Sequence, residues 1–451
     1  MNTVREWLQR LKGKPVTVSS REQYRWNEAL ELLGHVESDS SWVELSSHCN
    51  GFIREAAVRE LCSHSSPEAL VALIQRLNDW VPQVRDLAAN GLQSYLSPSH
   101  AMSLLAALEP LIALAGQRRV DHSPTLKTAR TLLQSSEMRD TVYANFLARQ
   151  GKTARYLFEL LIENQTASDM LLSSALAHRE LTVRLMAVSA CQALPTARAM
   201  PLLLEALSRP GAKVRVRVLH ALLPMLDDPT PVLRNALLDA SPAIRNLARW
   251  AAPRHNINAL VVLTAQLNQE PPTGKRDWLG CLGLAAELGA ELPERWRIEA
   301  LHSPYATVRQ LAVRLLRDEQ LHELFEALDD PSDNVFFAVV AQLGKQPWAF
   351  IAVEIGRKLD RDWHELSTAR RQGIFQLQPA WQQLAYLVRR LDTGAAERVF
   401  WLDQIDLWCD RQYQIVDPVT TGSARAVLVE ELRHLAENGL IRSDSFARVA
   451  G

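Results

Sequence analysis

The sequence predicts an all-α protein in which pairs of helices stack one after another into an α-solenoid. A Val or Ile followed by Arg recurs at intervals close to thirty residues or a multiple of thirty. The residues four and eight positions later are apolar or small, which is the spacing of one helix face. Pro or Asp precedes most copies, as expected where a helix begins. A unit of this size cannot bury its apolar faces alone, so neighbouring copies must stack.

The copies of the repeat are aligned on the Val or Ile that precedes the arginine. The clear matches are Ile53-Arg54, Val84-Arg85, Val183-Arg184, Val214-Arg215, Ile244-Arg245 and Val308-Arg309. Val335-Phe336 keeps the frame but lacks the arginine. Degenerate copies fill the wide gap after the second match, with LKTARTLL from Leu126 and KTARYLFELL from Lys152.

A first amphipathic helix is expected before each of these second helices. Examples are PEALVALIQRL from Pro67, TARAMPLLLEAL from Thr196 and DEQLHELFEAL from Asp318. The segment VRVRV from Val214 alternates like a strand, but the repeat frame places it in a second helix. NQEPPTGKRD from Asn268 is polar and rich in turn residues, so it is the clearest predicted loop.

These units resemble the HEAT repeat, in the short variety found in phycobilisome-lyase-type proteins. The turn Asp or Pro and the Val-Arg opening of the second helix carry the resemblance, and Asp79 with Arg85 and Asp239 with Arg245 keep the family's six-residue offset. The resemblance implies a right-handed solenoid of HEAT-like helix pairs, and an Asp–Arg ladder between adjacent repeats. Three units, at Val183, Val214 and Val308, lack the turn Asp, which leaves the ladder open there. Chromophore lyase activity is not predicted, because no bilin site is identifiable.

The chain ends do not fit the repeat. We expect an N-terminal helical cap at 1–45, the HEAT-like array at 46–345, and a Trp-rich C-terminal helical domain or cap at 346–451. Exposed solenoid ends need closing structures, so the tryptophans are interpreted as cap cores. They are Trp7, Trp26 and Trp42 at one end, and Trp348, Trp363, Trp381, Trp401 and Trp408 at the other. Trp401, Ile405 and Trp408 fall on one helix face.

The composition of the chain limits which classes of function are expected. The chain has 451 residues, 22% of them charged, and a net charge of −1, which gives no bulk attraction to nucleic acid or acidic membranes. The charged N-terminus lacks a signal-peptide core, and no run of about 18 apolar residues suggests a membrane span. Five scattered cysteines fit reduced thiols, so a cytoplasmic protein is expected.

Neither catalytic residues nor a metal or cofactor site is predicted. GKT at Gly151 resembles the end of a phosphate loop, but Phe146 occupies the place of its first glycine. Four metal-type side chains, His48, Cys49, Cys62 and His64, lie near one another in sequence. A helix between the two pairs would hold Cys49 and Cys62 about 20 Å apart, too far for one ion.

A partner surface is predicted where the second helices face outward, two and six residues after the Val or Ile. That stripe is charged at first and becomes apolar and aromatic in the middle of the chain. Residues 179–254 also contain eleven Lys or Arg and five Asp or Glu, a net charge of +6. Burial of the stripe by superhelical twist, and a merely solvated charged face, are the structural alternatives. The candidate partner-binding residues are Val216, Arg217, His220, Asn246, Arg249, Trp250, Arg254 and Arg314.

Two functions remain open. The first is a non-catalytic scaffold of adaptor, inhibitor or immunity type that holds a protein partner in its concave groove, and the partner could be acidic. The second is a DNA-binding protein of the alkyl-base DNA glycosylase type, with HEAT-like repeats, in which Trp250, Arg249, Arg254 and Asp239 would act. A duplex binder normally carries a broad basic footprint, and this chain has only a local one, so nucleic acid is the less favoured partner.

Overall fold

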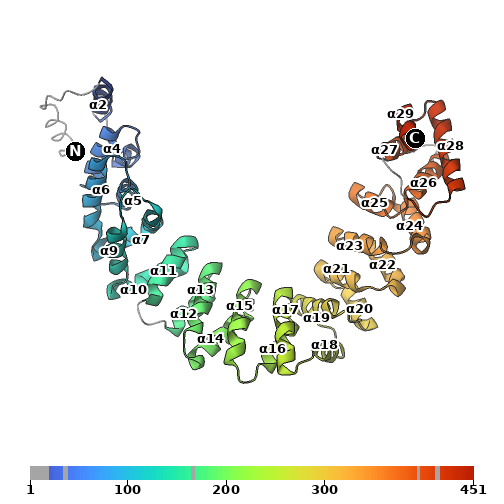
Figure 1. Cartoon of the computed structure of the whole chain (residues 1–451), viewed down its shortest axis with the longest axis horizontal. Coiled ribbons are helices and arrows are strands. Elements are labelled where there is room, and N and C mark those ends of the chain that lie inside the picture. Colours follow the sequence, from blue (N-terminus) through green and yellow to red (C-terminus); the bar gives the residue numbers. More distant parts are fainter. Residues whose placement is uncertain (1–19, 34–38, 164–167, 394–396, 412–416, 451) are drawn as a thin grey trace. The chain divides into compact units, whose positions relative to one another are not determined.

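The computed structural model describes residues 20–33, 39–163, 168–393, 397–411 and 417–450. They form two compact units, Met1–Asp227 and Asp228–Gly451. Within each unit consecutive helices lie side by side in chain order (Figure 1). No strand occurs in these ranges, so the predicted all-α solenoid of stacked helix pairs is confirmed. The predicted boundaries at 45 and 345 stay predictions.

The first unit consists of fourteen described α-helices with four short 3-10 turns between them. Its α-helices are α2 (Ser20–Leu33), α3 (Asp39–Leu45), α4 (Gly51–Leu61), α5 (Pro67–Arg76), α6 (Pro82–Tyr95), α7 (Ala101–Ala106), α8 (Leu108–Ala113), α9 (Ser123–Leu133), α10 (Arg139–Ala148), α11 (Gly151–Glu163), α12 (Asp169–Leu176), α13 (Leu181–Gln192), α14 (Thr196–Ser208) and α15 (Ala212–Leu222). The 3-10 turns are η1 (Pro98–His100), η2 (Leu114–Gly116), η3 (Ser136–Met138) and η4 (Leu223–Met225).

The second unit continues the same alternation. Its α-helices are α16 (Thr230–Leu237), α17 (Pro242–Ala251), α18 (Ala259–Leu267), α19 (Lys275–Leu288), α20 (Glu294–Leu301), α21 (Ala306–Leu315), α22 (Leu321–Ala327), α23 (Asp333–Leu343), α24 (Trp348–Asp362), α25 (Thr368–Phe375), α26 (Ala380–Thr393), α27 (Arg398–Asp410), α28 (Gly422–Glu437) and α29 (Ser443–Ala450). The 3-10 turns are η5 (Ala252–His255) and η6 (Asp318–Gln320).

The repeat frame explains how the helices pack. Each Val or Ile that opens a predicted second helix is buried, and so is the residue four positions later. In most units that later residue is alanine, whose small side chain lets the neighbouring helix approach closely. The VRVRV segment lies inside α15, as the frame predicted. There its alternating arginines occupy different sides, with Arg215 buried and Arg217 exposed.

The wide gap between Ile244 and Val308 is about two units long and contains the additional helix pair that this length predicts, although no Val-Arg match located it. It consists of α18 and α19, and α19 has neither the Val-Arg opening nor a turn Asp in register. The predicted loop from Asn268 is three residues shorter than expected, because Lys275, Arg276 and Asp277 form the first turn of α19. Asp277 favours this earlier start, since an acidic side chain stabilises a helix N-terminus.

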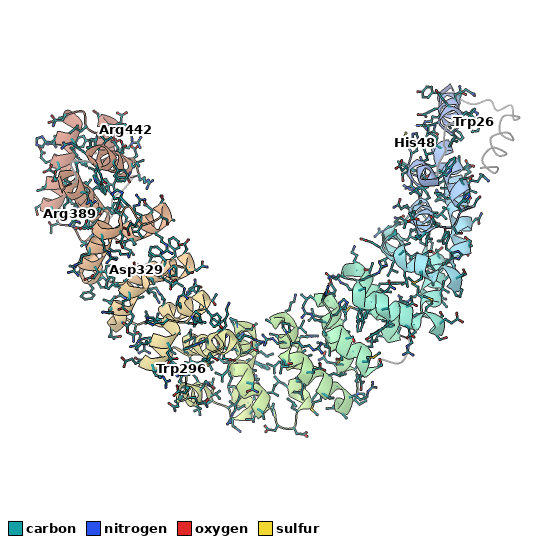
Figure 2. All side chains as sticks on the ribbon, turned by 180° about the vertical axis from the view of Figure 1, so that it is seen from behind. Trp26, His48, Trp296, Asp329, Arg389 and Arg442 are labelled. Carbon is teal, nitrogen blue, oxygen red and sulfur yellow. The ribbon has the colours of Figure 1, made fainter. Side chains whose placement is uncertain are left out.

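Most of the described tryptophans near the chain ends are core residues, whereas Trp26 and Trp348 are only half-buried. Trp363, Trp381, Trp401 and Trp408 are at most 6% exposed and belong to one cluster in the second unit. Ile405 is buried with Trp401 and Trp408 on the predicted face of α27. Trp42 is buried in the first unit, whereas Trp7 lies outside the described residues. Trp296, labelled in Figure 2, is a further core residue on α20 that packs edge-to-face against Trp278.

Among the described helices, none is by itself long and apolar enough to cross a membrane, but the segments Pro98–Ala106 and Leu108–Gly116, which meet at 80°, would qualify together by length and composition.

Candidate functional site

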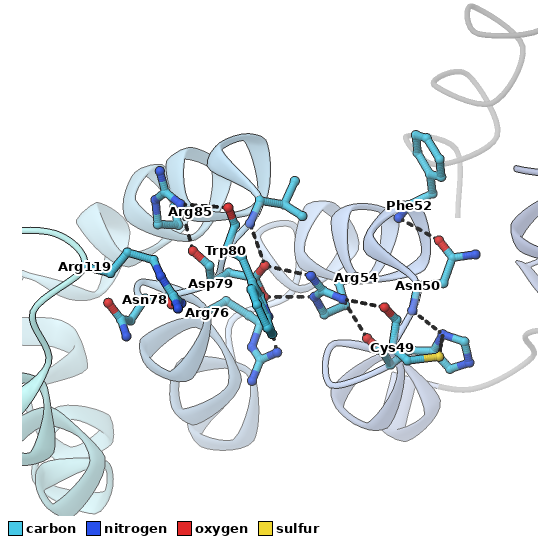
Figure 3. A network of polar contacts seen from close by, with 12 residues as sticks. Cys49, Asn50, Phe52, Arg54, Arg76, Asn78, Asp79, Trp80, Arg85 and Arg119 are labelled. Atoms are coloured by element: carbon cyan, nitrogen blue, oxygen red, sulfur yellow. Dashed lines mark hydrogen bonds and ion pairs between the residues drawn. The ribbon is translucent and has the colours of Figure 1, made fainter. Parts of the chain in front are cut away.

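An Arg–Asp ladder joins adjacent repeats and fixes how the second helices sit. Arg54 on α4 donates from Nε and Nη2 to the two carboxylate oxygens of Asp79, both at 2.8 Å (Figure 3). Its Nη1 donates to the backbone oxygens of His48 and Cys49 in its own turn. Arg54 and Asp79 are 6% and 5% exposed. One guanidinium thus joins its own turn to the turn of the next repeat.

The predicted contact between Arg85 and the turn Asp is present, but it runs through the backbone. Arg85 Nη1 donates to the carbonyl oxygens of Asp79 and Trp80, at 2.8 and 3.1 Å, and not to the carboxylate (Figure 3). Arg245 donates in the same way to the carbonyl oxygen of Asp239, at 2.7 Å. The carboxylate of Asp79 is engaged elsewhere, because Arg54 of the preceding repeat holds it.

In other repeats the arginine also bonds to a carbonyl oxygen of its own turn and to an acidic side chain of the next repeat, but the acid differs. Arg309 donates from Nη1 to Ser303 O in its own turn and makes a two-pronged ion pair with Asp330 of the next repeat. Arg245 reaches Glu287 on α19 instead of a turn Asp. The ladder therefore continues where the next repeat offers any acid within reach.

The turn Asp also caps its own turn, and other residue types replace it where it is missing. Asp79 Oδ1 accepts the backbone N–H of Val81 at 3.0 Å. In the unit of Val183, His178 Nδ1 accepts the N–H of Glu180 at 3.0 Å. In the unit of Val308, Ser303 Oγ accepts the N–H of Tyr305 at 3.3 Å. Two of the three units without the Asp thus keep the turn through another side-chain acceptor.

The GKT motif does not form an open phosphate cradle. Gly151 opens α11, and its N–H donates to Glu180 Oε2 at 3.0 Å. Arg155 on the same helix pairs with the other carboxylate oxygen at 2.9 Å. The side-chain hydrogen bond from Arg155, followed by the Gly151 amide, lowers the pKa of Glu180 to about 2. A permanent carboxylate thus occupies the helix N-terminus that a phosphate would need.

The four metal-type side chains near α4 lie at its two ends. His48 and Cys49 precede the helix and Cys62 follows it, as the spacing indicated. His48 Nδ1 instead accepts the backbone N–H of Asn50. Among the described residues, no group of three or more His, Cys, Asp or Glu side chains is placed to hold a metal ion.

The first unit contains three of the predicted partner-binding residues, all on α15. Arg217 and His220 are exposed and Val216 is half-buried. Arg215, which directly precedes Val216, is buried, as expected for a ladder position. The outward side of α15 therefore offers a short surface with one cation, one imidazole and part of one apolar side chain.

The second unit brings Asn246, Trp250 and Arg254 together. Asn246 and Trp250 are exposed one helical turn apart on α17, and Trp250 is 58% exposed. Arg254 on η5 lies over the indole, with its guanidinium carbon 3.8 Å from the ring centroid. It also donates to the backbone oxygen of Trp250. Superhelical twist does not bury this part of the stripe.

Two further predicted residues lie apart from this group. Arg249 is half-buried and pairs with Glu287 on α19, with Nε to Oε2 at 3.2 Å, beside the ladder residue Arg245. It was expected at the rim of a partner surface, but α19 supplies an acid that the sequence frame did not locate. Arg314 is exposed near the end of α21.

One exposed tryptophan escaped the sequence reasoning. Trp80 is 77% exposed in the turn before α6, and the guanidinium carbon of Arg119 lies 5.4 Å from its ring centroid. Arg119 also donates to Asn78 O at 2.6 Å (Figure 3). The signal was available, because the residue after the turn Asp is Ala240 or Pro331 in sibling units. A tryptophan at such a turn has no apparent packing role.

Comparison with known proteins identifies no family for the chain. No family model matches it, and no curated protein matches it. Among solved structures, one similar chain is the C-terminal fragment of the cohesin loader SCC2 from Chaetomium thermophilum, with 13% identity and a TM-score of 0.28. The match covers 98% of this chain and 36% of that fragment, so this chain spans little more than a third of its length. A likeness at this TM-score does not bear on function.

Proposed function

We propose that the chain is a non-catalytic scaffold of adaptor, inhibitor or immunity type that binds a protein partner through the outward side of its second helices. The observation that carries this proposal is the exposed pair of Trp250 and Arg254. Tryptophan and arginine are the residues most enriched among those that dominate interface energies. A large apolar ring left in water does not contribute to folding, so its retention favours an intermolecular contact.

The size of this contribution follows from the exposed area. A tryptophan buries about 200 Å² when fully covered, and Trp250 is 58% exposed. Covering the remainder at about 25 cal/mol per Å² would contribute about 3 kcal/mol. Arg254 already lies on one face of the ring, so a partner would contact the other face and the edge. The exposed Asn246, one turn away, adds a hydrogen-bonding group at the rim.

Val216, Arg217 and His220 form a second contact surface in the same proposal, and Arg314 a third. Their charge favours a partner that is acidic where it meets Arg217. The proposal includes repeats of the short HEAT-like, phycobilisome-lyase type, for which the Arg–Asp ladder is the support. It also includes a cytoplasmic location, in keeping with five cysteines that are all free thiols.

A variant pair tests the proposal. Tagged wild-type, Trp250→Ala and Phe350→Ala chains recover proteins from a lysate of the source cell. Phe350 is the matched control, because it is a 67% exposed aromatic of the same unit on α24. We expect one protein to be recovered by wild type and Phe350→Ala and lost with Trp250→Ala, while all three chains keep the same melting temperature. With the purified partner, Trp250→Ala should weaken binding by about 2 kcal/mol, or about 30-fold. Equal recovery by all three chains would refute the role of Trp250.

DNA binding of the alkyl-base glycosylase type is the second candidate, and the exposed Trp250 beside Arg254 is the observation that favours it. A gel-shift titration with duplex DNA at low salt tests it, since phosphate contacts are strongest there. Binding at micromolar protein that is lost on Arg254→Gln, with release of an alkylated base, would favour the enzyme over the scaffold. No shift at micromolar protein would eliminate it.

A further inference from the structure

A pocket of about 490 Å³ lies among α25, α26 and α27 of the second unit. Trp363, at the end of α24, forms part of its wall, and Phe375, Leu387 and Leu407 supply apolar surface. The volume is within the range of small-molecule sites, which are concave and mostly apolar with a few polar groups. None of these residues belongs to the partner surface proposed above, and the inference below does not depend on it.

Two buried N–H donors on the wall have no acceptor. Trp363 is 3% exposed, and its indole Nε1 has no hydrogen-bond partner among the described residues. Arg371 Nε is also buried without a partner, although Nη2 of the same side chain donates to Leu366 O at 3.3 Å. Buried donors in proteins are almost always paired, and leaving one unpaired is costly. Neither nitrogen is reached by solvent, so the case for a ligand rests on the groups that line the open part of the pocket.

The charged and polar side chains of the pocket favour an anionic ligand. Among the described residues that line it, Arg371 and Arg411 are charged, and none is Asp or Glu. Arg411 makes no ion pair with another residue in the described ranges. Gln372, Gln376 and Gln404 add side-chain amides that can donate as well as accept. The pocket therefore presents two positive charges and several donors beside apolar side chains, with no built-in counter-charge.

Other side chains pack against the Trp363 ring. Arg371 lies over one side of the Trp363 ring, 5.3 Å from its centroid, and Tyr386 stacks with the ring at 5.6 Å. Recognition by stacking on Trp363 is therefore not favoured. What remains is an anionic head held by guanidinium and side-chain amide groups, with an apolar body against Phe375 and Leu407.

We propose that this pocket binds a small organic anion, a carboxylate or phosphate carried next to an apolar group. Arg371 and Arg411 would hold the head, since charge-assisted hydrogen bonds from guanidinium to carboxylate or phosphate are the strongest polar contacts in proteins. The same chemistry is found in a free metabolite and in the C-terminal carboxylate of a peptide that ends in an apolar residue.

Matched probes on the full chain test the proposal by calorimetric titration. The first pair is 4-phenylbutyrate and its neutral amide, with phenyl phosphate as a second anion. The second pair is an acetylated peptide ending in Phe, with a free or an amidated C-terminus. We expect saturable binding of an anion with a Kd of about 1 mM or tighter, and at least tenfold weaker binding of its neutral amide. Binding of the small anions alone identifies a free metabolite as the source, and clearly tighter binding of the free-acid peptide identifies a chain terminus.

Three variants locate the site. Arg411→Gln and Gln376→Glu change exposed side chains at the pocket, so folding should be retained, and each should weaken anion binding at least tenfold. Arg389→Gln is the control, because Arg389 is exposed on α26 and pairs with Asp360 outside the pocket. Absence of saturable binding by every anion overturns the proposal. Binding that Arg411→Gln and Gln376→Glu leave unchanged, or that Arg389→Gln weakens equally, overturns it too.

Discussion

Loss of the Asp79 carboxylate should destabilise the first unit strongly. It accepts two hydrogen bonds from the buried guanidinium of Arg54 and one from the backbone N–H of Val81. Asp79→Ala would leave that guanidinium buried without its counter-charge. Removing one partner of a buried pair costs about 3–5 kcal/mol. Arg54 would keep its bonds to His48 O and Cys49 O, so the lower end of that range, about 3 kcal/mol, is expected.

An exposed pair of the same kind supplies the control. Asp169 pairs with Arg198 across a similar sequence separation, but the two side chains are 58% and 47% exposed. Exposed ion pairs contribute less than about 1 kcal/mol, so Asp169→Ala should be nearly neutral. The assay is urea unfolding followed by circular dichroism, with hydrogen exchange of α4 and α6 to localise the change, since solenoids unfold in parts. Equal losses in the two variants would show that Arg54 is rehydrated and that the ladder contact contributes little.

The pH dependence of stability gives an independent check on the same residue. Burial by itself would raise the pKa of Asp79, but hydrogen bonds from Arg54 and Val81 and the charges of Arg54 and Arg76 outweigh it and lower the pKa. A carboxyl with a depressed pKa stabilises the fold above its unfolded pKa of about 4, and this contribution is lost as the pH falls through the folded value. Wild type should therefore lose stability below about pH 4 more steeply than Asp79→Asn. Parallel curves for the two proteins would contradict the assigned pKa direction.

Two further predictions concern backbone packing and thiols. Gly280→Ala should destabilise the fold by about 2 kcal/mol or more, because the added Cβ would lie 1.9 Å from Leu238 O. Gly356→Ala on α24 should stabilise it slightly, because the added Cβ would have no atom within 4 Å. Similar melting temperatures for the two variants would mean that α19 shifts freely. In the native protein, iodoacetamide should label the exposed Cys49 before three buried thiols, because burial raises the pKa of those three. Mass spectrometry of the peptides measures the order of labelling. Early labelling of those three would contradict their burial; they are Cys191 and Cys281, with pKa values of about 11, and Cys409, with a pKa of about 12.

The parts of the fold that could be predicted are those where each repeat copies the same local rule. Val or Ile before Arg marks a buried helix position in every unit where it occurs, because one packing contact recurs. The pair of α18 and α19 could not be found this way. There Gly280 and Gly283 replace the usual frame, and an added Cβ at Gly283 would meet the Arg245 guanidinium at 2.4 Å. The helical apolar spacing of Trp278, Cys281, Leu282 and Ala285 remains, but the Val-Arg mark that identifies a second helix is absent.

The candidate site was only partly predictable for a related reason. Outward positions follow from the helical period, so the exposure of Trp250 could be expected from its place in the frame. The partner of an outward charge depends on the neighbouring helix, and Glu287 lies 38 residues after Arg249 with no sequence signal linking them. The C-terminal pocket depends on three helices outside the repeat frame, so the sequence did not indicate it.

Charge neutralisation within the chain bears on the choice between protein and nucleic acid. The sequence assigns residues 179–254 a net charge of +6, but part of that charge is engaged internally. Arg245 and Arg249 share Glu287, and Arg198 pairs with Asp169. A cation that already has a carboxylate partner gives up that pair to bind a phosphate, so it adds little to the counterion release that drives DNA binding. The exposed part of Trp250 keeps its apolar contribution under the same conditions, because internal contacts cover only the rest of the side chain. The balance of the surface therefore favours a protein partner that buries the indole over a duplex that would be held mainly by charge.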